Sequence, residues 1–271
     1  MDRLREYLAT HTGIVLAENK NYLIESRLKN ILTESHLPST DDLLRFLENH
    51  PGSSMLDDVV DAITTHETSW FRDSIFFDYI RQNFLPALLQ APSWNRSIEV
   101  WSAASSSGQE AYSFSVVVEQ CLKHIHPGMQ AVPPVNILGT DISKHVIRRA
   151  KSGVYTHAEL SRGLSDDYRR QYFDNMSDGS AIVKNAVRQR TRFLVHNLKD
   201  DYRMLGNFDI VMCRNVLIYF DEKTVETILR KIHGVLRKNG VLFLGATEHM
   251  HGLQDIYAHE PTPAGIMYRA L

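Results

Sequence analysis

Residues 98–113 read IEVWSAASSSGQEAYS, and this stretch decides the fold. Its first five residues form a short apolar run, which is typical of a buried β-strand. Small side chains and one glycine follow, and a helical pattern then runs from about Glu110 to His124. A turn of this kind lets a ligand approach the backbone at a helix N-terminus. Because only Gly108 is a glycine, an ordinary turn between a strand and a helix explains the stretch more simply.

The same succession of strand and helix continues toward the C-terminus. VNILGTDIS (135–143) predicts a second strand that ends at an acid, before a helix over 143–152, and FDIVMC (208–213) predicts a third before a helix over 222–237. VLFLG (241–245) predicts one more buried strand. Strands that alternate with helices favour an α/β fold with a doubly wound, mostly parallel sheet of the Rossmann-like kind.

Residues 164–198 interrupt this alternation. They contain a predicted short helix over 165–173 and two strand-like runs, at 181–187 and 191–195. We therefore expect a small antiparallel β-subdomain, at about residues 174–197, inserted into the sheet domain.

The N-terminal part of the chain is predicted to be entirely helical. Apolar residues recur there at helical spacing, and Pro51 with Gly52 interrupts the pattern. The expected helices cover 2–10, 19–35, 40–48, 54–65 and 74–89. The composition changes at Pro92, so we divide the chain into a helical N-terminal domain (1–72), a linker helix (73–92) and a sheet domain (93–271).

The bulk composition narrows the class of protein. The 271 residues are 43% hydrophobic with a formal net charge of −2, which predicts neither nucleic acid nor an anionic membrane as partner. Cys121 and Cys213 are too few for a disulfide framework or a CxxC zinc site, and no HExxH pair exists, so no metal is expected. No apolar run approaches the ~20 residues that span a bilayer. We expect a soluble, cytoplasmic monomer without direct membrane insertion.

Charged residues lie where the predicted strands end, which is where doubly wound sheets bind ligands. Asp141 closes the second strand, where a carboxylate can accept both hydroxyl protons of a ribose, although capping of the next helix explains it equally well. Glu110 either compensates a helix dipole or contacts the amino group of an amino-acid-like ligand. Arg214 and Asn215 follow a buried strand directly, so we expect both at the ligand crevice.

Five stretches taken together resemble the CheR-type chemotaxis receptor methyltransferases. They are TTHETSWFRD (64–73), VWSAASSSGQEAYS (100–113), GTDIS with RRAKSGVY (within 139–155), FDIVMCRNVLIYFD (208–221) and GVLFLGATE (240–248). Their order and approximate spacings agree with the family over almost the whole chain, including the helical N-terminal domain. The resemblance implies that residues 93–271 form a Rossmann-like methyltransferase domain.

The resemblance also implies the reaction and the site. The family transfers a methyl group from S-adenosylmethionine to glutamate side chains of methyl-accepting chemotaxis receptors, for sensory adaptation, and releases S-adenosylhomocysteine. Cofactor contacts carried over residue by residue are His66, Thr68, Arg72, Glu110, Asp141, Asn197, Leu198, Arg214 and Asn215. His66 stands where the family usually has Asn, and Gln109 and Ala111 replace a Glu and a Pro.

This chemistry needs few catalytic groups. The methyl group of a sulfonium is already activated, and a glutamate carboxylate, with a pKa near ~4.3, is ionised at neutral pH. Alignment and exclusion of water remain for the enzyme to provide. We expect Tyr219 and Arg72 to orient the carboxylate and the cofactor, although the place of Tyr219 alone favours simple packing beside Phe220.

The family's receptors present long cytoplasmic helices that bear glutamates, and the N-terminal helices are implied to meet them. Lys20, Arg27 and Lys29 are the candidate docking residues, although a solvated helix face is the commoner role of such charges. The loop within residues 172–193 is about three residues shorter than in members that bind a C-terminal receptor pentapeptide, so we expect no such tether. Recruitment to membrane receptor arrays is then expected through protein contacts.

Two other functions compete with this one. A methyltransferase for nucleic acid usually carries a [DN]PP[YF]-like loop where this chain has RNVLIYF (214–220), and the near-neutral charge also argues against it. A methyltransferase for a small molecule stays open. A catalytically silent module that only binds the cofactor is the second alternative, against which Asp141, Arg214, Asn215 and Tyr219 argue.

Overall fold

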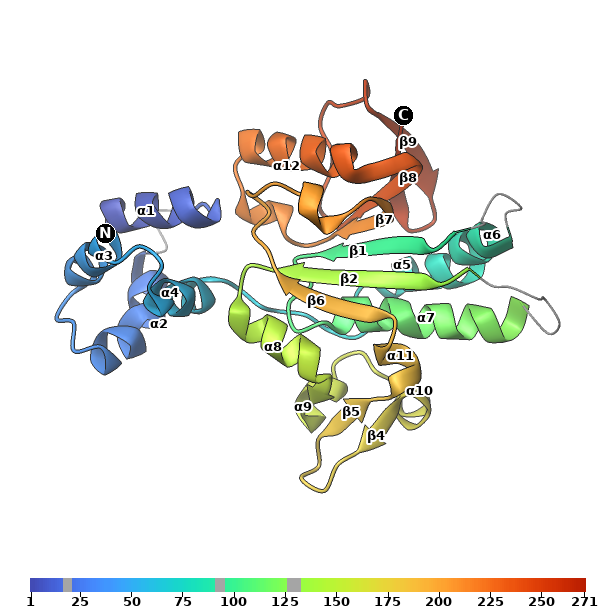
Figure 1. The fold of residues 1–271 in the computed structure, drawn as a ribbon, viewed down its shortest axis with the longest axis horizontal. Helices are drawn as coiled ribbons and strands as arrows, with labels where there is room; N and C mark the ends of the chain where they lie inside the picture. Colours follow the sequence, from blue (N-terminus) through green and yellow to red (C-terminus); the bar gives the residue numbers. More distant parts are fainter. Residues whose placement is uncertain (17–20, 91–95, 126–132) are drawn as a thin grey trace.

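The computed structural model describes residues 1–16, 21–90, 96–125 and 133–271 and has a helical part beside a large sheet (Figure 1). The helical part consists of α1 (Asp2–Thr12), α2 (Asn21–Glu34), α3 (Thr40–Asn49) and α4 (Ser54–Ile63). Their apolar faces meet in one buried cluster that includes Leu8, Leu28 and Leu43. Ser39 and Ser53 cap α3 and α4 by accepting backbone hydrogen bonds. The predicted start of the second helix, at Asn19, lies outside the described residues.

The large sheet has seven strands in the order β6-β2-β1-β7-β8-β10-β9. Five strands are parallel: β1 (Ile98–Ala103), β2 (Val135–Asp141), β6 (Thr191–Val195), β7 (Phe208–Cys213) and β8 (Leu236–Leu244). The C-terminal hairpin of β9 (Tyr257–Thr262) and β10 (Gly265–Ala270) adds two antiparallel strands at one edge. The predicted Rossmann-like α/β fold is confirmed, and the hairpin is an addition that we did not predict.

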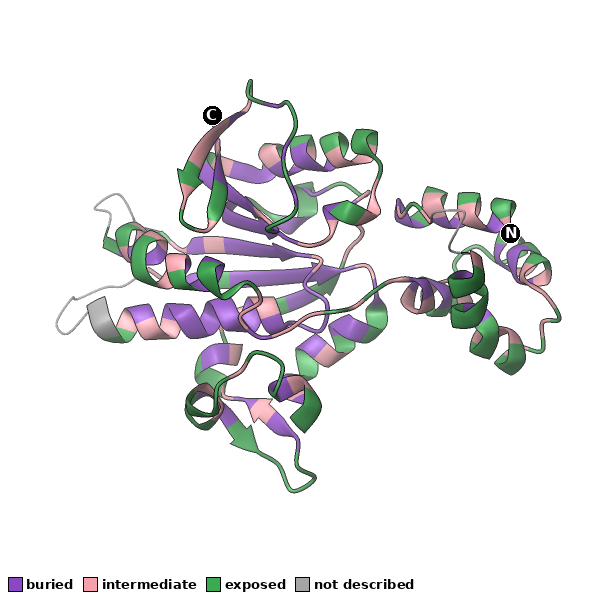
Figure 2. Ribbon diagram, turned by 180° about the vertical axis from the view of Figure 1, so that it is seen from behind, coloured by how far each residue is buried: buried purple, intermediate pink, exposed green. Residues whose placement is uncertain are grey.

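Helices cover both faces of this sheet, and the strands alternate their side chains between two cores. Val100 of β1 packs with α7 (Gln109–Ile125) and with the segment formed by α5 (Ser74–Tyr79), the π-helix η2 (Ile80–Phe84) and α6 (Leu85–Gln90). The next residue, Trp101, belongs to the core on the other face, which also contains residues of α12 (Glu222–Val235). Both faces of the central strands are therefore buried, as Figure 2 shows, which explains their nearly continuous apolar sequences.

A second, three-stranded antiparallel sheet projects from the large domain beyond α8 (Figure 1). Its strands pair in the order β3 (Val154–Tyr155), β5 (Ala181–Val183) and β4 (Phe173–Asn175). The helices around it are α8 (Lys144–Ser152), α9 (His157–Leu160), α10 (Asp166–Tyr172) and α11 (Asn185–Arg188). A small antiparallel insertion is thus present, as predicted.

The predicted extent of this insertion, about 174–197, is wrong at both ends. Residues 191–195 form β6, which pairs in parallel with β2 at the edge of the large sheet, and the small sheet begins as early as Val154. On β6 only Phe193 is buried, and a Cβ on Gly139 would lie 2.5 Å from its ring. A strand at the edge of either sheet would have one buried side chain and several charged, exposed ones. The sequence of residues 191–195 therefore did not show whether the strand belongs to the large sheet or to the small one.

No helix among the described residues is long and apolar enough to span a membrane.

Candidate active site

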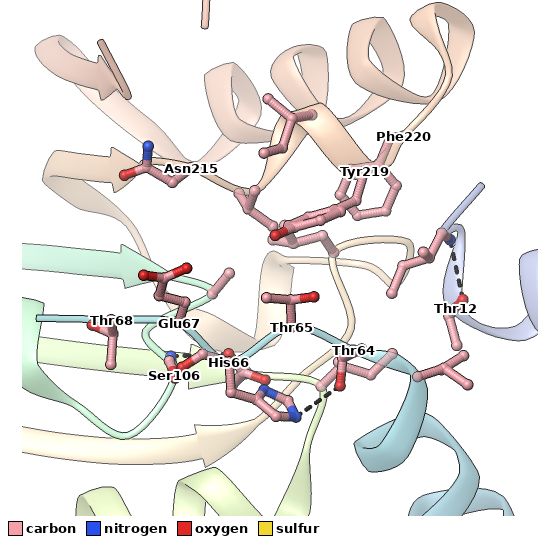
Figure 3. A pocket seen from close by; sticks show the side chains of 18 of the residues that line it. Thr12, Thr64, Thr65, His66, Glu67, Thr68, Ser106, Asn215, Tyr219 and Phe220 are labelled. Carbon is pink, nitrogen blue, oxygen red and sulfur yellow. Dashed lines mark hydrogen bonds between the residues drawn. The ribbon is translucent and has the colours of Figure 1, made fainter. Parts of the chain in front are cut away.

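A cavity of about 480 Å³ lies between the N-terminal helices and the carboxyl ends of the parallel strands (Figure 3). Its volume is typical of sites for small molecules and cofactors, about 300–1,000 Å³. All ten residues predicted to bind the cofactor or to act in catalysis line it: His66, Thr68, Arg72, Glu110, Asp141, Asn197, Leu198, Arg214, Asn215 and Tyr219. The structure therefore brings together residues from both parts of the chain, and their individual roles stay predictions.

Arg214 and Glu110 form a buried ion pair in the cavity wall. Arg214 donates to Glu110 Oε2 (3.0 Å) and to Asp73 Oδ2 (2.6 Å), and its guanidinium lies 4.1 Å from the centre of the Phe76 ring. Ser102 Oγ donates to Glu110 Oε1 (2.7 Å). Burial raises the pKa of Glu110, and the nearby positive charge of Arg214 opposes that rise. Two acids thus compensate one arginine, and Glu110 borders the cavity.

Asp141 ends β2 with each carboxylate oxygen accepting one backbone hydrogen bond. Oδ2 accepts from Ser106 N (2.9 Å) and Oδ1 accepts from Ser143 N (3.0 Å). The N-cap of α8 is Ser143, whose side chain accepts from Val146 N, so the capping interpretation of Asp141 is wrong. Burial raises the pKa of Asp141, while the two backbone bonds and the nearby His66 lower it.

The turn after β1 has a left-handed backbone at two residues that are not glycine, Ala104 (φ 57°) and Ser106 (φ 49°). Such conformations cost about 1–2 kcal/mol each and need support from neighbours. Ser106 receives it, because its N–H donates to Asp141 and its Oγ donates to the carbonyl of His66 (2.9 Å). The small side chains of the turn therefore bring its backbone to the cavity wall.

The segment between α4 and α5 brings His66, Thr68 and Arg72 to the cavity. The His66 ring lies 2.7 Å from Thr64 Oγ1 and 3.3 Å from Asp61 Oδ1, so it is turned toward α4 (Figure 3). Arg72 donates one hydrogen bond to the carbonyl of Glu67 (3.1 Å). The imidazole therefore contacts the end of α4 as well as lining the cavity, and its contact with the cofactor stays a prediction.

The end of α1 closes the cavity from the N-terminal side. Asn197 Nδ2 donates to the carbonyl of His11 (2.8 Å), and Lys199 Nζ donates to the carbonyl of Thr10 (2.6 Å). Val15 N donates to the carbonyl of Tyr219 (2.9 Å). The Asn197 side chain therefore already serves the contact between the two parts of the chain. Figure 3 shows the Tyr219 hydroxyl directed into the cavity, opposite the segment that carries Thr65.

The three candidate docking residues differ in their surroundings. Arg27 donates to the carbonyl of Ile63 (2.7 Å) at the end of α4 and lines the cavity, so its charge is engaged within the chain. Lys29 is exposed on α2, and Lys20 lies outside the described residues. Docking through Lys29 stays a prediction.

Sequence reasoning missed two acids that bond to residues of this site, Asp73 and Glu248. Asp73 is the second partner of Arg214, and Glu248 accepts hydrogen bonds from the loop that follows β7. Both lie inside stretches that resemble the family, at 64–73 and 240–248. Their position in those stretches was the only available signal, because their partners are distant in sequence.

The unused acceptor capacity of the cavity acids fits S-adenosylmethionine. A carboxylate has about four acceptor positions. Glu110 and Asp141 each accept two hydrogen bonds within the described residues and retain room for more. Asp141 can accept from vicinal ribose hydroxyls, and Glu110 can accept from an ammonium group, whose positive charge suits a buried acid.

Comparison with known proteins agrees with this assignment. Residues 1–64 match the family described as CheR methyltransferase, all-alpha domain, and residues 66–266 match CheR methyltransferase, SAM binding domain. Chemotaxis protein methyltransferase 1 of Pseudomonas aeruginosa is 41% identical over 266 residues, which cover 98% of this chain and 96% of that protein.

Two further relatives show the same near-complete overlap. Chemotaxis protein methyltransferase Cher2 of Pseudomonas putida is 38% identical over 273 residues, covering 99% of this chain and 97% of that protein. Chemotaxis protein methyltransferase of Vibrio parahaemolyticus is 39% identical over 263 residues, covering 97% and 94%. With a Rossmann-like sheet, an all-helical N-terminal domain and this degree of identity, the chain belongs to the CheR family of S-adenosylmethionine-dependent methyltransferases.

Proposed function

We propose that this protein transfers the methyl group of S-adenosylmethionine to glutamate side chains in the cytoplasmic helices of methyl-accepting chemotaxis receptors, for sensory adaptation. The observation that carries the proposal is the convergence of Glu110, Asp141 and Arg214 with Tyr219 on one cavity. The names of the relatives, chemotaxis protein methyltransferases, support the receptor as substrate.

Three groups of the cavity hold the cofactor in this proposal. Asp141 accepts from the ribose hydroxyls, and Glu110 accepts from the ammonium group. The guanidinium of Arg72 binds the carboxylate of the cofactor. When bound, S-adenosylmethionine supplies a methyl group that its positive sulfur already activates. Arg214 favours the ionised form of Glu110 and fixes its direction, so its own contribution to binding is largely indirect.

The remaining task of the chain is to align the substrate. The Tyr219 hydroxyl donates one hydrogen bond to the incoming glutamate carboxylate, which orients it and leaves the other oxygen free to attack. The contact between Val15 and Tyr219 keeps the N-terminal segment over the cavity and limits access of water. No proton needs to move, because a glutamate with a pKa near ~4.3 arrives ionised.

Receptor recognition is proposed to rely on the N-terminal helices and not on a receptor C-terminal pentapeptide. Strands β4 and β5 are joined by residues 176–180 in a tight turn, where Met176 N bonds to Ser180 O and Gly179 N bonds to Met176 O. Such a short connection supports the absence of a peptide-binding loop. Calorimetric titration with a receptor tail peptide is expected to show no binding, and micromolar binding would contradict this point.

The decisive experiment is transfer of labelled methyl groups from S-adenosylmethionine to a panel of receptor cytoplasmic domains from the same bacterium. We expect base-labile methyl esters on glutamates, located by peptide mass spectrometry. Methylation of a small molecule or nucleic acid instead would assign a different substrate, and binding of cofactor without any transfer would favour the silent module. Replacing Lys29 with Glu should weaken receptor methylation, and an unchanged rate would remove it from the docking surface.

A matched pair of tyrosine variants tests the catalytic role of Tyr219. Tyr219→Phe should lower kcat about tenfold, the value of one hydrogen bond to a charged group, while cofactor affinity stays unchanged. Tyr168→Phe is the control, because Tyr168 is also half-buried but packs against Phe71 away from the cavity. Equal rates for wild type and Tyr219→Phe would refute the role.

A further inference from the structure

Glu248 lies buried in the turn after β8, where its carboxylate accepts four hydrogen bonds from backbone N–H groups. Oε2 accepts from Asn215 (2.6 Å) and Gly245 (2.8 Å). Oε1 accepts from Val216 (2.8 Å) and Leu217 (2.7 Å). All four acceptor positions of this carboxylate are therefore filled, and it joins the carboxyl ends of β7 and β8.

Three of these donors belong to the loop that carries cavity residues. The loop leads into the 3-10 helix η4 (Leu217–Tyr219), and the first N–H groups of a helix have no partner within it. Asn215 has φ 59°, a left-handed conformation that must be held by its surroundings. Glu248 satisfies these donors and supports this backbone, so one side chain fixes the segment that presents Asn215 and Tyr219 to the cavity.

Gly245 is part of the same arrangement. A Cβ at this position would lie 2.6 Å from Glu248 Oε2 and 2.9 Å from Asn215 N, which is too close for any side chain without displacement. Neither Gly245 nor Glu248 is among the residues that line the cavity. The two residues therefore act on the cavity only through the loop that they hold.

We propose that Glu248 is a positioning residue for methyl transfer, an inference that rests on the function proposed above. By anchoring residues 215–217 it keeps the Tyr219 hydroxyl directed at the incoming carboxylate. Asn215 is itself a predicted cofactor contact, but the two acids predicted to bind the cofactor keep their own bonds, from Ser106 N to Asp141 and from Ser102 Oγ to Glu110. Loss of the Glu248 anchor therefore reduces kcat without a matching loss of cofactor affinity.

The test compares full-length wild type with Glu248→Gln. The amide keeps the shape of the side chain but turns an NH₂ group toward two of the four N–H donors. We expect kcat for receptor methylation to fall about tenfold or more, as two bonds to a charged acceptor are lost. Calorimetric affinity for S-adenosylhomocysteine should change less than about threefold. Backbone amides of residues 215–217 should exchange hydrogen faster.

A second variant and a control separate positioning from general destabilisation. Gly245→Ala keeps the Glu248 carboxylate but pushes it away from its donors. It should therefore show the same loss of kcat with little loss of affinity, to a smaller extent. Asp209→Asn removes a buried carboxylate from the other end of β7, where it pairs with Arg96 and Arg237, so it lowers stability but leaves kcat and exchange at 215–217 unchanged.

Two results would overturn the inference: a kcat within about threefold of wild type for Glu248→Gln, or a loss of S-adenosylhomocysteine affinity as large as the loss of kcat. A wild-type enzyme that methylates no receptor would instead overturn the proposed function. Even then, unchanged hydrogen exchange at residues 215–217 in Glu248→Gln would refute the anchor by itself.

Discussion

Buried carboxylates paired with arginine lie at both ends of strand β7, and the one at the carboxyl end, Glu110 of α7, lines the cavity. At the amino end, Asp209 accepts four hydrogen bonds, two from Arg96 and one each from Arg237 and the backbone N–H of Glu99. At the carboxyl end, Glu110 accepts two from the described residues, Ser102 and Arg214.

This difference separates acids whose hydrogen-bonding capacity is filled within the protein from acids that can still accept hydrogen bonds. A carboxylate has about four acceptor positions, and Asp209 and Glu248 each accept four hydrogen bonds within the protein. Glu110 and Asp141 use half and line the cavity. Burial raises the pKa of Glu110 and of Asp141, which reflects the cost of holding incompletely solvated charges. Unused acceptor capacity inside a cavity therefore marks the binding acids better than burial alone.

The largest effect on affinity is expected from breaking the cluster of Arg214, Glu110 and Asp73 at the carboxyl end of β7. Arg214→Met leaves Glu110 and Asp73 without their shared partner, which should lower S-adenosylhomocysteine affinity at least about 100-fold and unfolding free energy by about 3–5 kcal/mol. Arg237→Met makes the same change at the amino end, where Arg96 still pairs with Asp209. Calorimetry should therefore show nearly normal affinity for Arg237→Met, and equal losses in both variants would contradict the comparison.

Glu110 and Asp141, which have unused acceptor positions, are called the open acids below. A smaller loss of affinity is expected when one of them is neutralised. Asp141→Asn keeps the shape of the side chain but cannot accept both ribose hydroxyl protons with a negative charge. Affinity for S-adenosylhomocysteine should fall about 10- to 100-fold, the value of hydrogen bonds to a charged group. Adenosine, which shares the ribose, should lose affinity in proportion. A loss confined to S-adenosylhomocysteine would place the ribose elsewhere.

The pH dependence of binding should reveal the same open acids. Because burial raises the pKa of Glu110 and Asp141, both take up protons at higher pH than ordinary acids do, and the protonated forms bind the ligand poorly. Affinity should therefore fall as pH falls through the raised pKa values, by up to about tenfold per pH unit for each proton.

The ligand-free protein should respond to pH with the opposite sign. An acid whose folded pKa is raised contributes stability when protonated, and this contribution is lost as pH rises through the folded pKa. Calorimetry and thermal unfolding across this pH range measure both trends. Glu110→Gln should flatten the decline in affinity, and an unchanged slope would assign the titration to other groups.

The smallest effect on binding is expected at the amino end of β7, where Asp209 already accepts four hydrogen bonds. Asp209→Asn should lower unfolding free energy by about 1–3 kcal/mol, because its arginines are partly exposed and screened by solvent. Affinity for S-adenosylhomocysteine should stay within about twofold of wild type. Denaturant unfolding and calorimetry on the same preparation check both values, and a large loss of affinity would show that the two ends are coupled.

Local patterns predicted most of the fold. The strand predicted at 208–213 has the same bounds in the structure, where all six of its residues are buried. The C-terminal hairpin was missed because β9 contains His259, Glu260 and Pro261, which hide its alternation. Strand β6 was assigned to the wrong sheet because it lies at a sheet edge and buries one side chain, Phe193. Its sequence therefore lacks the apolar run of a central strand.

The candidate site was predicted as a set of residues but not as a network. Family motifs named Glu110, Asp141 and Arg214, and the structure places them on one cavity. Hydrogen bonds across long sequence separations left no local signal: Arg214 meets Asp73 across 141 residues, and Arg27 reaches Ile63 across 36. The second bond gives Arg27 a structural role that its exposed position on α2 did not suggest.

Titration of the full-length chain with S-adenosylhomocysteine tests the central claim most directly, because it asks whether the cavity with its open acids is the cofactor site. Wild type and Arg237→Met should both show saturable binding of one ligand per chain, whereas Arg214→Met should show almost none. Absence of binding to wild type, or equal binding to Arg214→Met, would contradict the account.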